Sequence, residues 1–185
     1  MTAIDAAWEP SNEEAISIDS LMPGRVLTVC SMYIWVEVEV FRLQYEITPA
    51  TEPHPPGEAS PDAWAAWEER NDWGLTGRDD AGTGYEAPSG SFGPSPDGSK
   101  TEGGLDIYPL PAPDAAWLDL TFHGGGGADC SDHHHYTLRV ILPLPTLTNE
   151  DIAMRKGADG AEWLVLAERV RLHRKEMEGR TRPGD

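Results

Sequence analysis

Apolar and polar residues alternate along several short stretches of this chain, a period of two that is typical of β-strands with one buried face. The longest such stretch runs from Arg25 to Thr48. Its apolar positions are first even-numbered and then odd-numbered, with the change near Phe41: Val36, Val38 and Val40, then Leu43, Tyr45 and Ile47. A change of parity places successive apolar residues on opposite faces of one strand. The pattern therefore predicts either a β-bulge or two separate strands.

Further strands follow at short intervals. Residues 73–85 predict a hairpin whose turn lies at 79–82, where Gly82 can adopt a positive φ. Residues 105–108 and 117–122 alternate again, and the prolines between them predict a corner. Residues 136–142 predict a last strand. Residues 86–103 are rich in Gly, Ser and Pro, and we expect them to form a mobile loop.

Two stretches have helical patterns instead. Residues 63–71 predict two helical turns with Asp62 as the N-cap, and Trp64 and Trp67 then share one face. The structural interpretation of these tryptophans is that they pin a short helix to the edge of the sheet, and the functional one is that they form a partner-binding platform. Residues 161–178 predict an amphipathic C-terminal helix.

The pattern predicts one all-β domain with three parts. Residues 1–24 are expected to form a loosely ordered acidic arm, residues 25–150 the β domain, and residues 151–185 a C-terminal helix and basic tail. A length of 185 residues suits one domain with a real core, and the 19 Gly and 16 Pro suit short strands and turns.

Charge excludes some classes of partner. The net charge is −18, from 32 acidic and 14 basic residues. A surface for nucleic acid needs clustered Lys and Arg, and an anionic membrane surface repels an acidic protein, so we expect neither partner. Residues 1–19 contain five acids and no base, which does not fit a secretory signal, and the best apolar run includes Glu37 and Glu39. We therefore expect a cytoplasmic protein.

One resemblance emerges from residues 73–85 and 108–120. The first segment carries Trp73, Leu75, Thr76, Asp80, Gly82, Thr83 and Tyr85, and the second carries Tyr108, Pro109, Pro111, Ala115, Leu118 and Leu120. Across about 50 residues this order resembles uncharacterised actinobacterial proteins with an immunoglobulin-like β-sandwich domain. The resemblance implies an antiparallel immunoglobulin-like sandwich of about seven strands, here with a short edge helix and a C-terminal helix. It implies no activity.

Ligand-type side chains are densest at residues 129–135, Asp-Cys-Ser-Asp-His-His-His. If a strand begins there, His133 and His135 point to the same side and, with Asp132, form a candidate Zn²⁺ site. The alternative is that this segment, which follows four glycines, holds no metal. No other pair of ligands with metal-site spacing is evident in the sequence.

Catalytic signatures are lacking in the sequence. It has no Gly-x-Ser-x-Gly nucleophile pattern, and residues 124–127 lack the Lys and Ser/Thr of a phosphate-binding loop. The leading hypothesis is a non-catalytic binding module that acts through contacts with an unidentified protein partner. The alternatives are a metal-binding protein or metal-dependent hydrolase that uses His133 to His135, and an acidic mimic that occupies a basic partner.

Overall fold

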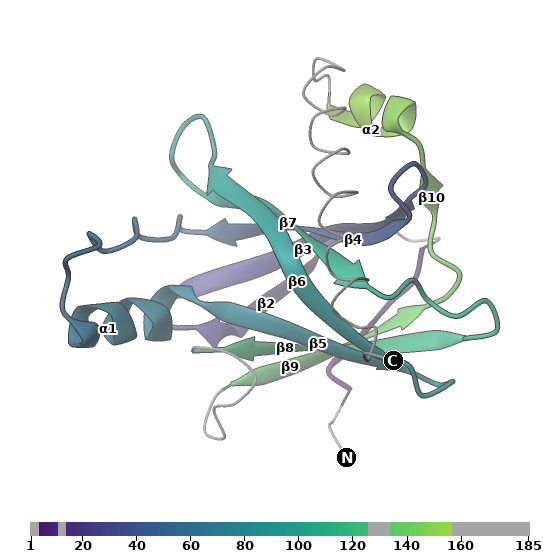
Figure 1. The fold of residues 1–185 in the computed structure, drawn as a ribbon, viewed down its shortest axis with the longest axis horizontal. Helices are drawn as coiled ribbons and strands as arrows, with labels where there is room; N and C mark the ends of the chain where they lie inside the picture. Colours follow the sequence, from purple (N-terminus) through teal and green to yellow (C-terminus); the bar gives the residue numbers. More distant parts are fainter. Residues whose placement is uncertain (1–3, 11–13, 126–133, 157–185) are drawn as a thin grey trace, which may run out of the picture.

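A computed structural model of the chain describes residues 4–10, 14–125 and 134–156. The fold is mostly β, with two short helices (Figure 1). In chain order the elements are β1 (Ala6–Trp8), β2 (Ile16–Met22), β3 (Arg25–Trp35), β4 (Val40–Thr48), α1 (Pro61–Asn71), β5 (Trp73–Asp79), β6 (Gly84–Pro94), β7 (Thr101–Tyr108), β8 (Trp117–Gly124), β9 (His135–Ile141), β10 (Thr146–Leu147) and α2 (Asn149–Lys156).

The strands form one continuous sheet that nearly closes into a barrel. Their order is β1-β9-β8-β5-β6-β7-β4-β3-β10, and β2 pairs with the edge of β3. Only β1 and β10 run parallel to the strands they pair with, β9 and β3. The sheet curves back on itself where β2 approaches β8. At this point a β-carbon on Gly124 would collide with the backbone carbonyl of Leu21, so the close approach requires a glycine.

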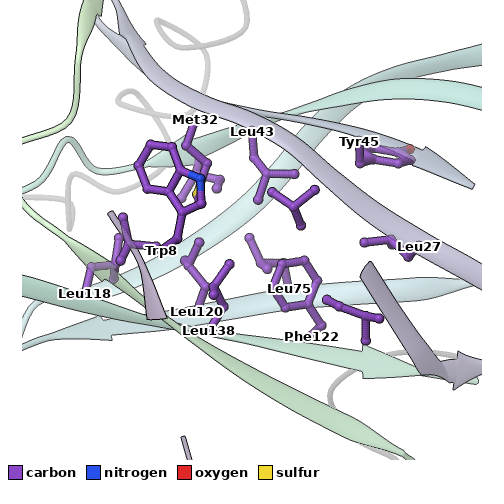
Figure 2. Close-up of a cluster of buried hydrophobic side chains, with 14 of the residues drawn as sticks. Trp8, Leu27, Met32, Leu43, Tyr45, Leu75, Leu118, Leu120, Phe122 and Leu138 are labelled. Carbon is purple, nitrogen blue, oxygen red and sulfur yellow. The ribbon is translucent and has the colours of Figure 1, made fainter. Parts of the chain in front are cut away.

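The concave side of the sheet holds the main hydrophobic core (Figure 2). Inward-facing residues alternate along each strand, as the period of two predicts. Fully buried members from the central strands include Leu27, Met32, Phe41, Leu43, Leu118, Leu120, Phe122 and Leu138. Trp8 of the short strand β1 packs into the same core, beside Val140 in register.

A second, smaller core lies on the opposite face of β3 and β4. It contains Tyr33, Trp35, Val38, Val40, Leu147 and Ile152. The segment from β10 to α2 covers this face, and the Trp35 Nε1 donates to the Asn149 side-chain oxygen at 2.7 Å. The fold therefore buries apolar side chains on both faces of its longest hairpin.

The all-β class is confirmed, whereas the immunoglobulin-like arrangement is not. The strands follow one hydrogen-bonded path, and β2 closes the space between β3 and the β8–β9 pair. The N-terminal segment also differs from the loosely ordered arm that the sequence predicted, because its described residues include β1 and β2. Trp8, Ile18, Leu21 and Met22 are buried there, and this burial supplies the free energy that orders the segment.

The change of parity near Phe41 is confirmed, and it arises from two strands. Residues 36–39 form the turn between β3 and β4, with Glu39 at a positive φ of 50°. Phe41 and Leu43 are both fully buried after the turn. A register shift does occur, but within β3, between Val29 and Ser31.

The prediction of a mobile loop at residues 86–103 is wrong. Most of this stretch is strand β6, which pairs with β7 from Glu86 to Pro94. Only residues 95–100 connect the two strands. Gly and Ser lower intrinsic strand propensity, but the ladder to β7 satisfies their backbone groups.

The helices agree with the sequence where the structure describes them. Helix α1 forms at the predicted place, although Ser60 is its N-cap and Pro61 opens its first turn. Helix α2 begins at Asn149. The C-terminal helix predicted at 161–178 lies outside the described residues. Neither α1 nor α2 has the length and apolar character needed to cross a lipid bilayer.

Candidate functional site

An aromatic cluster forms between helix α1 and strand β6. The spacing of Trp64 and Trp67 by three residues puts both rings on one face of α1, with centroids 6.2 Å apart. His54 stacks on Trp67 with a centroid distance of 4.2 Å and lies 5.9 Å from Trp64. The Phe92 ring of β6 lies 6.2 Å from His54 between ring centroids. The structure thus adds His54 and Phe92 to the two tryptophans that the sequence proposed for partner binding.

Hydrogen bonds tie helix α1 to the segment that carries His54. The Trp67 Nε1 donates to the carbonyl oxygen of Glu52 at 3.1 Å. The Asn71 side chain accepts from the Glu52 backbone N–H at 2.8 Å and donates to the Trp67 carbonyl at 2.9 Å. The Arg70 guanidinium and the Glu52 carboxylate form an exposed ion pair at 3.1 Å. These contacts hold the aromatic cluster in one geometry.

The cluster opens onto a cavity of about 400 Å³. We call it the aromatic pocket and define it by His54, Trp64, Trp67, Trp73, Phe92 and Tyr45. Tyr45 and Trp73 belong to the core and meet edge to face, with centroids 4.8 Å apart. Phe92 is 60% exposed, an unusual state for so large an apolar side chain. The pocket therefore extends from the hydrophobic core to the protein surface.

Charge around the aromatic pocket is acidic. Glu68 and Asp72 belong to its lining, while no Lys or Arg among the described residues does. The Asp72 carboxylate accepts a hydrogen bond from the Trp73 N–H at 2.9 Å. Its remaining polar groups are small, including Thr51, Ser89 and Thr101. The arrangement offers aromatic faces and carboxylates together, which suits an apolar or cationic group better than an anion.

A second hollow, of about 540 Å³, lies over the outer face of β4 and β7. At its base the Arg42 guanidinium donates to Asp106 at 2.7 Å and to Ser91 at 3.1 Å. The guanidinium lies on Gly104, where a β-carbon would approach its Nη2 to 2.7 Å. Asp106 compensates the charge of Arg42, and the lining residues Glu46 and Glu102 both pair with Lys100, at 2.6 and 3.0 Å. The charges at this hollow are therefore mutually compensated.

The buried pair Asp79 and Tyr85 has a structural role in the turn between β5 and β6. The Tyr85 hydroxyl donates to one carboxylate oxygen of Asp79 at 2.7 Å, and the Thr83 N–H donates to the other at 2.7 Å. Together these bonds close the turn between β5 and β6, where Gly82 has a φ of 91°. Since both carboxylate oxygens accept hydrogen bonds, the buried charge is compensated.

The structure describes one of the three residues that the sequence proposed as metal ligands. Asp132 and His133 lie outside the described residues, while His135 is the exposed first residue of β9. Its partner across the sheet is His123 of β8. Within residues 4–10, 14–125 and 134–156, no group of three ligand-type side chains is close enough to hold a metal ion. The predicted Zn²⁺ site thus stays a prediction.

His123 was not predicted, because nothing in its local sequence marks it. Its Nε2 lies 2.8 Å from the hydroxyl of Thr76 on β5. Burial lowers the pKa of His123 below the usual 6.5, and the neighbouring His135 lowers this pKa further. The imidazole is therefore neutral at neutral pH. Only the register between β8 and β9 reveals the pairing of the two histidines.

No family model matches this sequence, and no curated protein or solved structure matches it either. The resemblance to actinobacterial proteins with an immunoglobulin-like domain thus stays a prediction.

Proposed function

We propose that this protein is a non-catalytic, cytoplasmic binding module, and that the aromatic pocket receives a cationic side chain, Arg or Lys, of a protein partner. The observation that carries the proposal is the pocket itself, in which Trp64, Trp67 and Phe92 surround a cavity of about 400 Å³. Aromatic side chains dominate the binding energy of protein interfaces when they line a pocket that excludes water.

The preference for a cationic side chain follows from the residues that line the aromatic pocket. A guanidinium or ammonium group is attracted to the faces of tryptophan rings within about 6 Å. Glu68 and Asp72 are acidic residues of the same lining, and the whole chain carries a net charge of −18. Such a charge steers basic partners toward the protein and speeds their association.

Rigidity also favours a binding role. The hydrogen bonds of Asn71 and Trp67 to the Glu52 backbone hold α1 against the chain before it. Binding to a preformed pocket costs less conformational entropy than binding that must first order the site. The pocket's position, between a helix and the connecting segment that precedes it, is a usual one for recognition.

A peptide titration tests the proposal. The probe is an eight-residue peptide with one central Arg, and its matched control carries Gln at that position. Binding is followed by NMR of the indole N–H groups in the full chain. We expect the Arg peptide to shift the Trp64 and Trp67 signals, and the Gln peptide to bind about tenfold more weakly, a difference that corresponds to the roughly 1–2 kcal/mol of a cation–π contact.

Two variants make the test specific. Trp67→Ala should abolish the preference for Arg over Gln. Trp117→Ala is the matched control, because Trp117 stacks with Arg139 on another part of the sheet, 3.8 Å from guanidinium carbon to ring centroid. This control should keep the preference. Equal affinity for both peptides, or an Arg preference that survives Trp67→Ala, would contradict the proposal.

The acidic-mimic hypothesis gives a different outcome. A mimic would bind a basic partner through its net charge of −18, without using the aromatic pocket. Affinity would then fall steeply with salt in the wild type and in Trp67→Ala alike. Equal salt dependence with equal affinity in both proteins would favour the mimic over the pocket.

A further inference from the structure

Two histidines lie directly opposite each other on neighbouring antiparallel strands. In the register of β8 and β9, His123 faces His135. The adjoining residues form a hydrogen-bonded pair, since the Gly124 N–H donates to the His134 carbonyl at 3.0 Å. His123 and His135 are therefore a non-hydrogen-bonded pair, the type whose Cα atoms are only about 4.5 Å apart. Their imidazoles leave the same face of the sheet side by side.

We propose that His123 and His135 together bind a divalent transition-metal cation, with Zn²⁺ as the representative ion. Imidazole nitrogen is a preferred ligand for Zn²⁺, Cu²⁺ and Ni²⁺. Two imidazoles leave the other coordination positions to water. The site is separate from the aromatic pocket and does not depend on the function proposed for it.

Thr76 prepares the ring of His123 for this role. Its hydroxyl lies 2.8 Å from the His123 Nε2. When Nε2 carries the hydrogen and donates to Thr76, the lone pair is left on Nδ1, which is then the ligand atom. A hydrogen bond to the non-ligating nitrogen is the usual way in which proteins fix the orientation and the tautomer of a metal-binding histidine. Thr76 is thus a positioning residue.

The same face of the sheet leaves room for an ion and does not repel one. On β5 the residue opposite His123 is Gly74, which has no side chain. Two rows further along, Arg139 is held by Asp119 through two bonds of 2.7 and 2.8 Å. Its positive charge is therefore compensated before it can act on the histidine pair.

The test is isothermal titration of the untagged full-length chain with Zn²⁺, because an affinity tag of histidines would bind the ion itself. We expect His123→Ala and His135→Ala each to weaken binding by at least about tenfold. His134→Ala is the matched control: His134 lies opposite Gly124, so its side chain leaves the other face of the sheet and its removal should leave the affinity unchanged. Circular dichroism of each variant verifies that the fold is retained.

His123 is the decisive position, because it lies outside the run His133 to His135. If His123→Ala binds Zn²⁺ as tightly as the wild type does, the cross-strand site is wrong, and any bound ion belongs to that run. If the variant fails to fold, NMR of the wild type decides instead. Zn²⁺ must then perturb the imidazole signals of both His123 and His135, and a perturbation of His135 alone overturns the proposal.

Thr76 supplies a second, independent test. Thr76→Val removes the hydroxyl at constant shape and should weaken Zn²⁺ binding by about tenfold, the lower end for partners of metal ligands. Thr76→Ser restores the hydroxyl and should restore the affinity. A weakened affinity in both variants would assign Thr76 a packing role and contradict its positioning role.

Discussion

Two regions of this molecule that contain tryptophan differ in how closely other side chains pack around the indole ring. Trp8 is 3% exposed and is packed among Met32, Leu118 and other core residues (Figure 2). Trp67, at the α1 side, borders an open cavity of about 400 Å³. Tryptophan thus fills the hydrophobic core in one region and lines an open cavity in the other. The comparison separates a side chain that fills the core from one that borders an open cavity.

Glycines on the inner faces of β6 and β7 let large side chains pack directly against the sheet near α1. A β-carbon on Gly103 would collide with the Tyr45 ring, and one on Gly90 would come within 2.7 Å of the Leu105 side chain. The Tyr45 ring and the Leu105 side chain therefore occupy the space over these two glycines, and both residues line the aromatic pocket. Around Trp8, β1 and β2 bring their own large side chains against the sheet.

Trp8→Ala should have the largest effect on stability. Emptying a buried tryptophan site costs roughly 3–5 kcal/mol of unfolding free energy, because the surrounding core cannot fully collapse. Urea unfolding measures the loss. Trp8→Phe should cost much less, since it keeps most of the ring and removes an indole N–H that has no hydrogen-bond partner among the described residues. An unchanged urea midpoint for Trp8→Ala would mean that β1 adds little to the core.

Tyr45 should give the fold an alkaline limit. Burial raises the pKa of Tyr45 to about 12, although the nearby Arg42 lowers this pKa in part. In the unfolded chain the phenol has a pKa of about 10 and ionises first, so stability should fall as the pH rises from 10 to 12. The loss approaches about 3 kcal/mol for two pH units.

Tyr45→Phe is the control for this pH dependence. Urea unfolding of both proteins between pH 9 and pH 12 should show a shallower decline for Tyr45→Phe. Parallel curves would assign the alkaline loss to other groups, such as the Tyr136 phenol, whose pKa is also raised by burial.

Phe92→Ala should have the smallest effect on stability, within about 0.5 kcal/mol, because the side chain is 60% exposed. The same substitution should weaken the Arg-peptide interaction, since Phe92 belongs to the aromatic pocket. The measurements are urea unfolding and the peptide titration on one preparation. A large loss of stability together with unchanged peptide binding would contradict this prediction. It would mean that Phe92 stabilises the core and does not contribute to the aromatic pocket.

Periodicity predicted most of the fold, and its failures have physical causes. The alternation at 73–79, 105–108, 117–122 and 136–142 corresponds to strands in the structure. Strand β6 was missed because its Gly, Ser and Pro residues carry no apolar pattern; its partner β7 orders it through the backbone. The predicted arm contains β1 and β2 because a few large apolar residues can order short strands when a core lies beside them.

The candidate sites show the same limit. Helical spacing identified Trp64 and Trp67, but their neighbours His54 and Phe92 come from outside the helix, from the segment before it and from β6. His123 is separated from His135 by eleven residues, and no local pattern links them. Such pairs depend on strand register, which a local sequence window does not contain.

By itself, the sequence determined the local features: which stretches alternate as strands, that a short helix forms around Trp64 and Trp67, and that the chain carries a net charge of −18. These depend on neighbouring residues, whose steric and solvation preferences act over a few positions. The tertiary structure alone decided that the sheet nearly closes, with Gly124 against the Leu21 carbonyl, and that the aromatic pocket stays open. Those outcomes depend on which surfaces meet, and the free energy of burial is shared among residues that are far apart along the chain.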